Sequence, residues 1–147
     1  MTNPNDCWAT PHDWYDRIWR AWLTEPPNID VCADATNTKC PLYFTEAQDA
    51  LSLDWVAEAE RLGVRPLFWM NPPYSEPLIT DFISKAVQQS AHGGTTVFLL
   101  PNWTQNRWYH NYIKLVDHEF TLGRIKHIPP PGVKPSSPRY GSIHGVI

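Results

Sequence analysis

Short apolar runs alternate along this chain with longer stretches in which apolar residues recur every three or four positions. The short runs predict buried strands, and the three-to-four spacing predicts helices with one apolar face. We therefore expect strands at 28–33, 67–70 and 95–100, and helices at 10–23, 52–62 and 77–90. Because helices and strands alternate, the pattern favours an α/β fold with a mostly parallel sheet covered by helices.

Both ends of the chain carry further local signals. Thr10 is expected to cap the first helix, with Pro11 at its first position, and Trp14, Ile18 and Trp22 are expected to share one face. Towards the C-terminus we expect a helix capped by Thr104, two strands, and a Pro/Gly/Ser-rich loop between the strands, at 104–116, 119–128, 141–147 and 129–138 respectively. A C-terminal antiparallel hairpin is the simplest topology for these last two strands.

The length of 147 residues suits one domain with a real core. The length is too small for a core plus a sizeable recognition domain, so we expect residues 1–147 to form a single minimal domain without a separate recognition domain. The sequence has no apolar stretch of about 20 residues, and its N-terminal segment has neither a basic nor an apolar leader region. We expect a cytoplasmic protein with no membrane partner.

The cysteines indicate a reducing compartment. Cys7, Cys32 and Cys40 form an odd set without a close pair, which argues against a disulfide framework. Cys32 and Cys40 could join His12 around zinc, but their spacing lacks the short knuckle of structural zinc sites. The other histidines show no metal-ligand or catalytic-triad spacing, so we expect no metal.

Charge is divided unevenly between the two parts of the chain. Residues 1–100 hold 6 Lys or Arg against 13 Asp or Glu, whereas residues 101–147 hold 6 against 2. The acidic part suits a cationic small molecule, and the basic part, with interleaved aromatic residues, suits a polyanion. An ordinary solvated surface would have the same composition. The candidate contacts to such a polyanion are Arg107, Arg124, Lys126, Lys134 and Arg139, and the interleaved aromatic residues include Trp103, Trp108 and Tyr109.

The tetrapeptide Asn71-Pro72-Pro73-Tyr74 follows the apolar run 67–70 directly. Its residues suit an amino group conjugated to an aromatic ring, which needs acceptors around its hydrogens before it can attack an electrophile. The Asn71 side-chain oxygen and the Pro72 carbonyl can be those acceptors, because the prolines lack amide hydrogens and hold the turn rigid. Tyr74 offers a flat face for a heterocycle, a contact worth roughly 1–3 kcal/mol. The alternative is that Pro72-Pro73 is merely a sharp exit from a strand.

The chain resembles the phage-type DNA N-6-adenine methyltransferases, a Dam-like family, over nearly its whole length. The order and spacing of several short motifs carry the resemblance. These motifs are Trp8-Ala9-Thr10-Pro11, Asp30-Val31-Cys32-Ala33 with Asn37, Asp49-Ala50-Leu51 with Asp54-Trp55, Asn71-Pro72-Pro73-Tyr74-Ser75, Leu99-Leu100-Pro101 with Trp108, and Gly123-Arg124-Ile125.

The resemblance implies a Rossmann-like fold and the transfer of a methyl group from S-adenosylmethionine to the 6-amino group of adenine in duplex DNA. Asn71, Pro72, Pro73 and Tyr74 would hold an adenine flipped out of the duplex. The implied cofactor-binding residues are Trp8, Thr10, Pro11, Asp30, Ala33 and Asp49, with Asp54 as a weaker candidate that would equally suit a helix N-terminus. The loop at 30–35 departs from most methyltransferases, because alanines stand where glycines are usual.

Several alternatives stay open at this point. Methyltransferases that act on RNA bases or on protein glutamine share the Asn-Pro-Pro-Tyr motif, although the glutamine enzymes usually keep a glycine-rich cofactor loop. A non-catalytic nucleic-acid-binding or anti-restriction protein is a further alternative, although a binding protein has no need to polarise an amine. The recognised DNA site, a role in restriction–modification or in gene regulation, and the oligomeric state, a dimer included, are not determined by the sequence.

Overall fold

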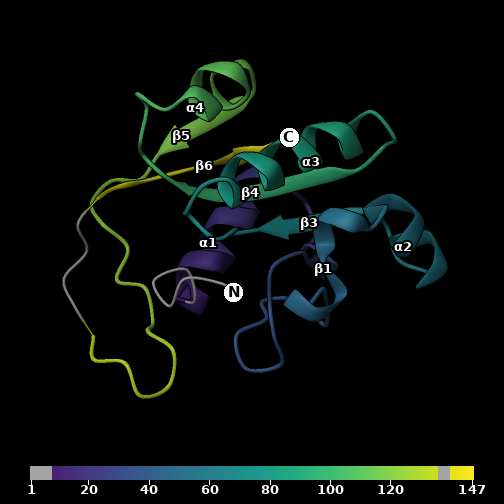
Figure 1. Ribbon diagram of the computed structural model, residues 1–147, viewed down its shortest axis with the longest axis horizontal. Helices are drawn as coiled ribbons and strands as arrows, with labels where there is room; N and C mark the ends of the chain where they lie inside the picture. Colours follow the sequence, from purple (N-terminus) through teal and green to yellow (C-terminus); the bar gives the residue numbers. More distant parts are fainter. Residues whose placement is uncertain (1–7, 136–139) are drawn as a thin grey trace.

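The computed structural model, which describes residues 8–135 and 140–147, contains one six-stranded mixed sheet with the order β2-β1-β3-β4-β6-β5 (Figure 1). The pairs β1–β2, β1–β3 and β3–β4 are parallel, and β6 is antiparallel to both β4 and β5. The strands are β1 (Ile29–Asp30), β2 (Leu42–Tyr43), β3 (Leu67–Met70), β4 (Thr95–Pro101), β5 (Asp117–Phe120) and β6 (Ser142–Val146). An α/β fold is therefore confirmed, and its sheet is mixed.

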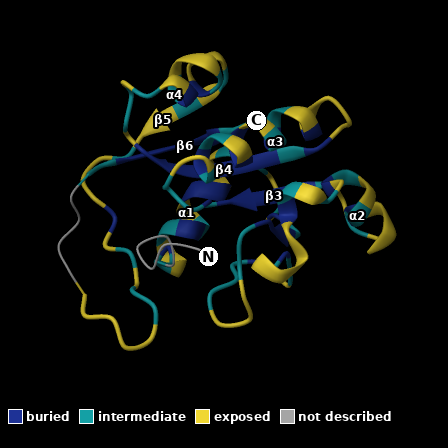
Figure 2. Ribbon diagram, in the orientation of Figure 1, coloured by how far each residue is buried: buried dark blue, intermediate teal, exposed yellow. Residues whose placement is uncertain are grey.

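Helices cover both faces of the sheet. The α-helices are α1 (His12–Trp22), α2 (Trp55–Arg61), α3 (Leu78–Ser90) and α4 (Arg107–Asn111), and the 3-10 helices are η2 (Glu46–Gln48), η3 (Ala50–Ser52) and η4 (Ile113–Leu115). Side chains alternate between the faces along each strand. Trp69, Val97 and Leu99 therefore pack against α1, while Phe68, Met70 and Phe98 pack against α2, α3 and α4. Figure 2 shows β3 and β4 buried between these two layers.

The first helix is shorter than predicted and differs in how it begins. Pro11, not Thr10, occupies the N-cap position, and no side chain caps the helix. The expected apolar face is centred differently, because Tyr15, Ile18 and Trp19 are its buried residues. Trp14 and Trp22 pack at the margin of that cluster. The Thr10 hydroxyl instead accepts a hydrogen bond from the Asn71 side chain.

Two C-terminal predictions are wrong. The expected helix at 104–116 is two short helices that begin only at Arg107, because the backbone at 101–106 forms successive turns and Tyr112 leaves helical geometry (φ −129°, ψ −61°). The expected strand at 119–128 stops at Phe120, because the Thr121 hydroxyl donates to the carbonyls of Gly123 and Ser142, and Gly123 turns the chain with a φ of +82°. The following residues, which we call the arm (121–135), extend away from the sheet (Figure 1).

The other elements agree with the sequence to within a few residues. The strand at 67–70 is confirmed with its bounds. The strand expected at 28–33 has only two residues, and the helix expected at 52–62 begins at Trp55 because Asp54 caps it. The parallel strands β1, β3 and β4 end at one edge of the sheet, where the chain connections diverge to β2 on one side and to β4 on the other. Such a switch point is where α/β sheets bind ligands.

Candidate active site

Asn71 follows β3 directly at this edge, and its side-chain amide is held at both ends. The Asn71 Nδ2 atom donates to Thr10 Oγ1 at 2.9 Å, and the Tyr74 hydroxyl donates to Asn71 Oδ1 at 2.8 Å. Thr10 is only 2% exposed. The structure thus brings together three of the residues that the sequence selected, from two segments that are 61 positions apart.

The turn at 71–74 is rigid and bordered by aromatic rings. Pro72 is buried and Pro73 is partly buried, and neither has an amide hydrogen to place in a ladder. The half-buried ring of Tyr74 lies 6.0 Å from the rings of both Trp103 and Tyr140, and those two rings lie 5.4 Å apart. Burial raises the pKa of the Tyr74 hydroxyl well above its usual range, so this group stays a hydrogen-bond donor.

Sequence reasoning did not assign Trp103 and Tyr140 to the site. Trp103 was notable only as an aromatic residue in the basic part of the chain, and Tyr140 is separated from Tyr74 by 66 positions. One feature of the sequence could have indicated that Trp103 lies at the site: it stands two residues beyond the end of a buried strand. Trp108, in contrast, was expected to accompany the basic residues but is buried in the core.

Asp30 ends β1, next to β3, and is a buried carboxylate. Only 3% of it is exposed. Its Oδ1 atom accepts from the Cys32 backbone N–H at 3.1 Å and its Oδ2 atom from the Lys39 backbone N–H at 3.0 Å. Burial raises the pKa of Asp30 to about 7, against the lowering effect of those two hydrogen bonds and of the Lys39 charge. This acid is therefore poised to change charge near neutral pH.

The loop after β1 is closed by its own polar groups. The Ala33 N–H donates to the Phe44 carbonyl at 3.1 Å. Asp34 accepts three hydrogen bonds from Thr36 and Asn37, and the Asn37 side-chain oxygen accepts from the Asp34 N–H. The loop thus keeps a fixed shape without glycine, at the same edge of the sheet as Asn71.

The segment 8–11 crosses this edge. Ala9 and Ile128 exchange two backbone hydrogen bonds of 2.7 Å, which join the segment to the arm. Trp8 and Pro11, expected near the cofactor, are partly buried on either side of this bridge. The segment is therefore fixed by the arm before it and by α1 after it.

The two acidic candidates between β2 and α2 differ in their surroundings. Asp49 is exposed and, among the residues that the structure describes, is the one non-glycine residue with a positive φ (52°). Asp54 accepts from the Ala57 N–H at 3.1 Å as the N-cap of α2. The helix-start interpretation of Asp54 is therefore the better one.

Replacement of Asp54 by alanine should lower the free energy of unfolding by about 1 kcal/mol, the usual cost of a lost N-cap. Affinity for S-adenosylmethionine, the cofactor that the family resemblance implies, should not change, because the side chain serves the helix. Urea denaturation together with calorimetric titration of S-adenosylmethionine checks both statements. A loss of cofactor affinity in a variant of normal stability would return Asp54 to the cofactor site.

The basic candidates lie on other segments than Asn71. Arg107 begins α4, and Arg124, Lys126 and Lys134 lie on the arm; all four are exposed. Arg139 lies outside the described residues. The arm is attached to the body by Ile125, which is buried against α1, and by the Ala9–Ile128 bridge. The arm is therefore held to the body at two points, and its basic side chains can contact a polyanion.

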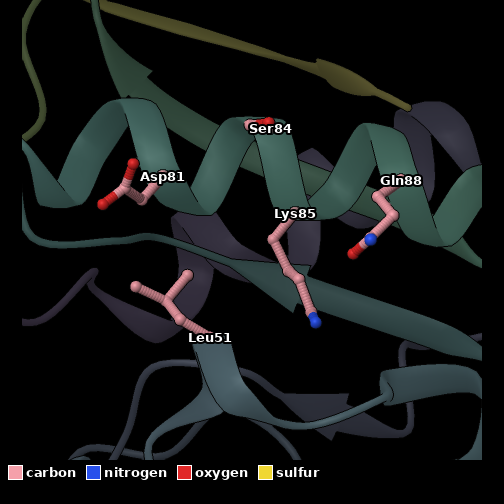
Figure 3. Close-up of a pocket in the computed structure, with 5 residues that line it drawn as sticks. All are labelled: Leu51, Asp81, Ser84, Lys85 and Gln88. Atoms are coloured by element: carbon pink, nitrogen blue, oxygen red, sulfur yellow. The ribbon is translucent and has the colours of Figure 1, made fainter.

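Other features of the described chain do not form a second site of this kind. Cys40 contacts the Tyr15 hydroxyl at 3.8 Å, and no group of three or more His, Cys, Asp or Glu residues in the described ranges is arranged to hold a metal ion. None of the described helices is long and apolar enough to cross a membrane. A hollow between η3 and α3 is open to solvent and is lined by none of the predicted site residues (Figure 3); its lining is Leu51, Asp81, Ser84, Lys85 and Gln88.

A comparison with known protein families shows to which family this chain belongs. The model of the DNA N-6-adenine-methyltransferase (Dam) family matches residues 1–140. The chain belongs to the Dam family. Its relatives include the DNA N-6-adenine-methyltransferase of Haemophilus phage HP1, 34% identical over 105 residues, and that of Escherichia phage T1, 27% identical over 104 residues.

Each of these matches covers 71% of this chain, but only 54% of the HP1 protein and 39% of the T1 protein. The chain thus spans about half or less of the length of these Dam relatives. No solved structure matches the chain. The family match includes all the site residues described above, from Trp8 to Tyr140.

Proposed function

We propose that this chain transfers a methyl group from S-adenosylmethionine to the 6-amino group of adenine in DNA. The observation that carries the proposal is the Asn71 amide, fixed by two hydroxyl groups at the switch point of the sheet. Membership of the Dam family supports the choice of substrate. Within residues 1–147 we propose one minimal methyltransferase domain of Rossmann-like fold. The residues between Ala33 and Asn71 form β2, η2, η3 and α2, which supports a domain without a separate target-recognition part.

The residues around β1 fit the proposed cofactor. S-adenosylmethionine carries an ammonium and a sulfonium group, and a buried carboxylate can stabilise such charges because water screens them little there. Asp30 supplies that carboxylate, with Ala33 in the following loop and with Trp8 and Pro11 on the segment above. Asp49, exposed on a strained backbone (φ 52°), is the proposed acceptor for the cofactor adenine, since such strain concentrates at functional sites. When bound, this cofactor supplies an electrophilic methyl group.

The residues after β3 would act on the amine. Asn71 Oδ1 and the Pro72 carbonyl accept from the two amine hydrogens, which raises electron density on the nitrogen and orients its lone pair. Tyr74 contacts the face of an adenine that has left the duplex, since an amine within the base pair cannot reach the cofactor. No strong base is needed, because the nitrogen loses a proton readily once it carries the new methyl group. The contribution of the chain is positioning and polarisation.

The basic residues of the arm should position DNA through its phosphates. Arg124→Ala and Lys126→Ala should each weaken binding to all duplex sequences alike and reduce the slope of log affinity against log salt by about 1. Fluorescence anisotropy at several salt concentrations measures this slope. Arg65→Ala is the matched control, because Arg65 pairs with Glu25 near the start of β3, at the opposite edge of the sheet. An equal effect of Arg65→Ala would contradict the assignment of the arm.

The proposed reaction is tested by offering labelled S-adenosylmethionine with unmethylated duplex DNA, RNA and a protein extract in parallel. We expect label in DNA alone, recovered as N-6-methyladenine after digestion to nucleosides. Label in RNA or in protein glutamine would replace the proposed substrate. Cofactor binding without transfer to any of the three would identify a non-catalytic binding protein.

A further inference from the structure

The hydroxyl of Thr10 holds the nitrogen end of the Asn71 side-chain amide. A side-chain amide has two hydrogens to donate and one oxygen with two lone pairs. Thr10 takes one hydrogen of Asn71 at 2.9 Å, and Tyr74 uses one lone pair at 2.8 Å. One lone pair of the oxygen is left for a target amine. The amide is thus fixed in orientation while it keeps one acceptor.

The orientation of this amide decides what it can do. The terminal torsion of asparagine is soft and roughly two-fold, so a turn of 180° exchanges the oxygen and the nitrogen at little intrinsic cost. After that turn, an NH₂ group would face the hydrogens of the target amine and would repel them. Thr10 accepts from the nitrogen end while Tyr74 donates to the oxygen end, so the two hydroxyl groups together maintain the reactive arrangement.

Thr10 is itself held firmly enough to serve as that partner. It is 2% exposed. The preceding residue, Ala9, is paired in both directions with Ile128, and the carbonyl of the following residue, Pro11, accepts from the Tyr15 N–H at 3.0 Å as α1 begins. The hydroxyl thus sits on a backbone fixed on both sides.

We propose that Thr10 is a positioning residue, which holds the Asn71 amide with its oxygen towards the target amine instead of contacting the cofactor. This inference rests on the proposed function, because it concerns the same amine. It reassigns Thr10 from the cofactor-binding role that the family resemblance implied. The side chain acts through Asn71 and does not itself touch the reacting atoms.

The test compares two substitutions of similar size. Thr10→Val keeps the shape of the side chain but removes the hydroxyl, and Thr10→Ser keeps the hydroxyl. Thr10→Val should lower kcat about tenfold, the effect of one lost hydrogen bond, with the KM for S-adenosylmethionine within about twofold of the parent. Thr10→Ser should restore most of the turnover. Thr80→Val, on α3, removes a hydroxyl that donates to the Glu76 carboxylate; it is the matched control and should change neither value.

A double-mutant cycle separates positioning from general damage. In an Asn71→Ala background, Thr10→Val should cause no further loss in single-turnover experiments, because its partner is already gone. A full additional loss there would overturn the proposal. So would equal damage from Thr10→Ser and Thr10→Val, or an effect confined to the KM for the cofactor.

The failure of this inference is distinct from the failure of the proposed function. If the parent protein methylates no DNA, the proposed function fails. The Asn71 side-chain amide signals in an NMR spectrum still test the contact, since Thr10→Val should shift these signals and Thr10→Ser should leave them close to their original positions. Unchanged signals in Thr10→Val would overturn the positioning role.

Discussion

Asn71→Ala should lower the turnover number about 10²–10³-fold, the range found when a single preorganised group that stabilises a transition state is removed. The loss is large because alanine provides no acceptor for the amine and leaves Thr10 and Tyr74 without their common partner. The affinity for S-adenosylmethionine should stay within about twofold of the parent value, because Asn71 serves the amine. Single-turnover methyl transfer and calorimetric titration measure the two quantities separately.

Asn28→Ala is the matched control for this experiment. Asn28 also contributes a side-chain amide, but its Nδ2 atom donates to the Arg65 carbonyl at the opposite edge of the sheet. Its replacement should leave turnover unchanged. Full activity in Asn71→Ala would sink the assigned chemistry, whereas a parallel loss in both variants would indicate damaged folding rather than a missing acceptor.

The affinity for S-adenosylmethionine should rise about tenfold between about pH 5.5 and about pH 7.5. Asp30 is buried and has a pKa of about 7, so it is mostly neutral at the lower end of this range and mostly charged at the upper end. A ligand with ammonium and sulfonium groups favours the charged form. The sulfonium charge is permanent, and the ammonium group of the ligand stays mostly protonated over this range, because α-amino groups titrate at about 7.7 or above.

Asp30→Asn removes this titration and should flatten the pH profile, while Asp81→Asn, on the exposed face of α3, should leave it unchanged. The other titratable groups that influence or are influenced by this carboxyl are Lys39, Asp34, Tyr15, Cys32 and Cys40. A profile that keeps its slope in Asp30→Asn would show that another group is responsible. Isothermal titration at several pH values provides the measurement.

The same carboxyl has the opposite effect on the protein without ligand. Its pKa is raised on folding from 3.8 to about 7. The folded state therefore binds the proton more tightly than the unfolded state, and this contribution to stability is complete below about pH 4 and is lost as the pH rises through about 7. The apo protein thus carries a cost at neutral pH that a cationic ligand can offset.

The sequence predicted the parts of the fold that depend on local pattern. The strand at 67–70 was readable because a parallel strand buried on both faces is a continuous apolar run. Asn71 and Tyr74 could be predicted as site residues because their motif follows this strand directly. The helix at 104–116 was not, because its first residues are used in turns that close onto the end of β4, and this tertiary environment is not visible in local propensity.

The partners of the site residues were the harder part. Thr10 was assigned to a helix cap and to the cofactor, since a Thr before Pro favours the start of a helix. Its actual contact with Asn71 joins two segments that are distant in the chain, and no periodicity predicts such a pairing. The hydroxyl of Tyr74 was overlooked for a related reason, because stacking accounts for the aromatic ring without requiring a role for the oxygen.

The position of β6 in the sheet has a consequence for how the protein is made. This strand follows β5 in the chain, yet it lies between β4 and β5 in the sheet and pairs with both. During synthesis from the N-terminus, the edges of β4 and β5 that pair with β6 therefore stay unpaired until residues 142–146 leave the ribosome. The edge proposed for catalysis is built around β1 and β3, so its residues leave the ribosome before the strand that joins β4 to β5.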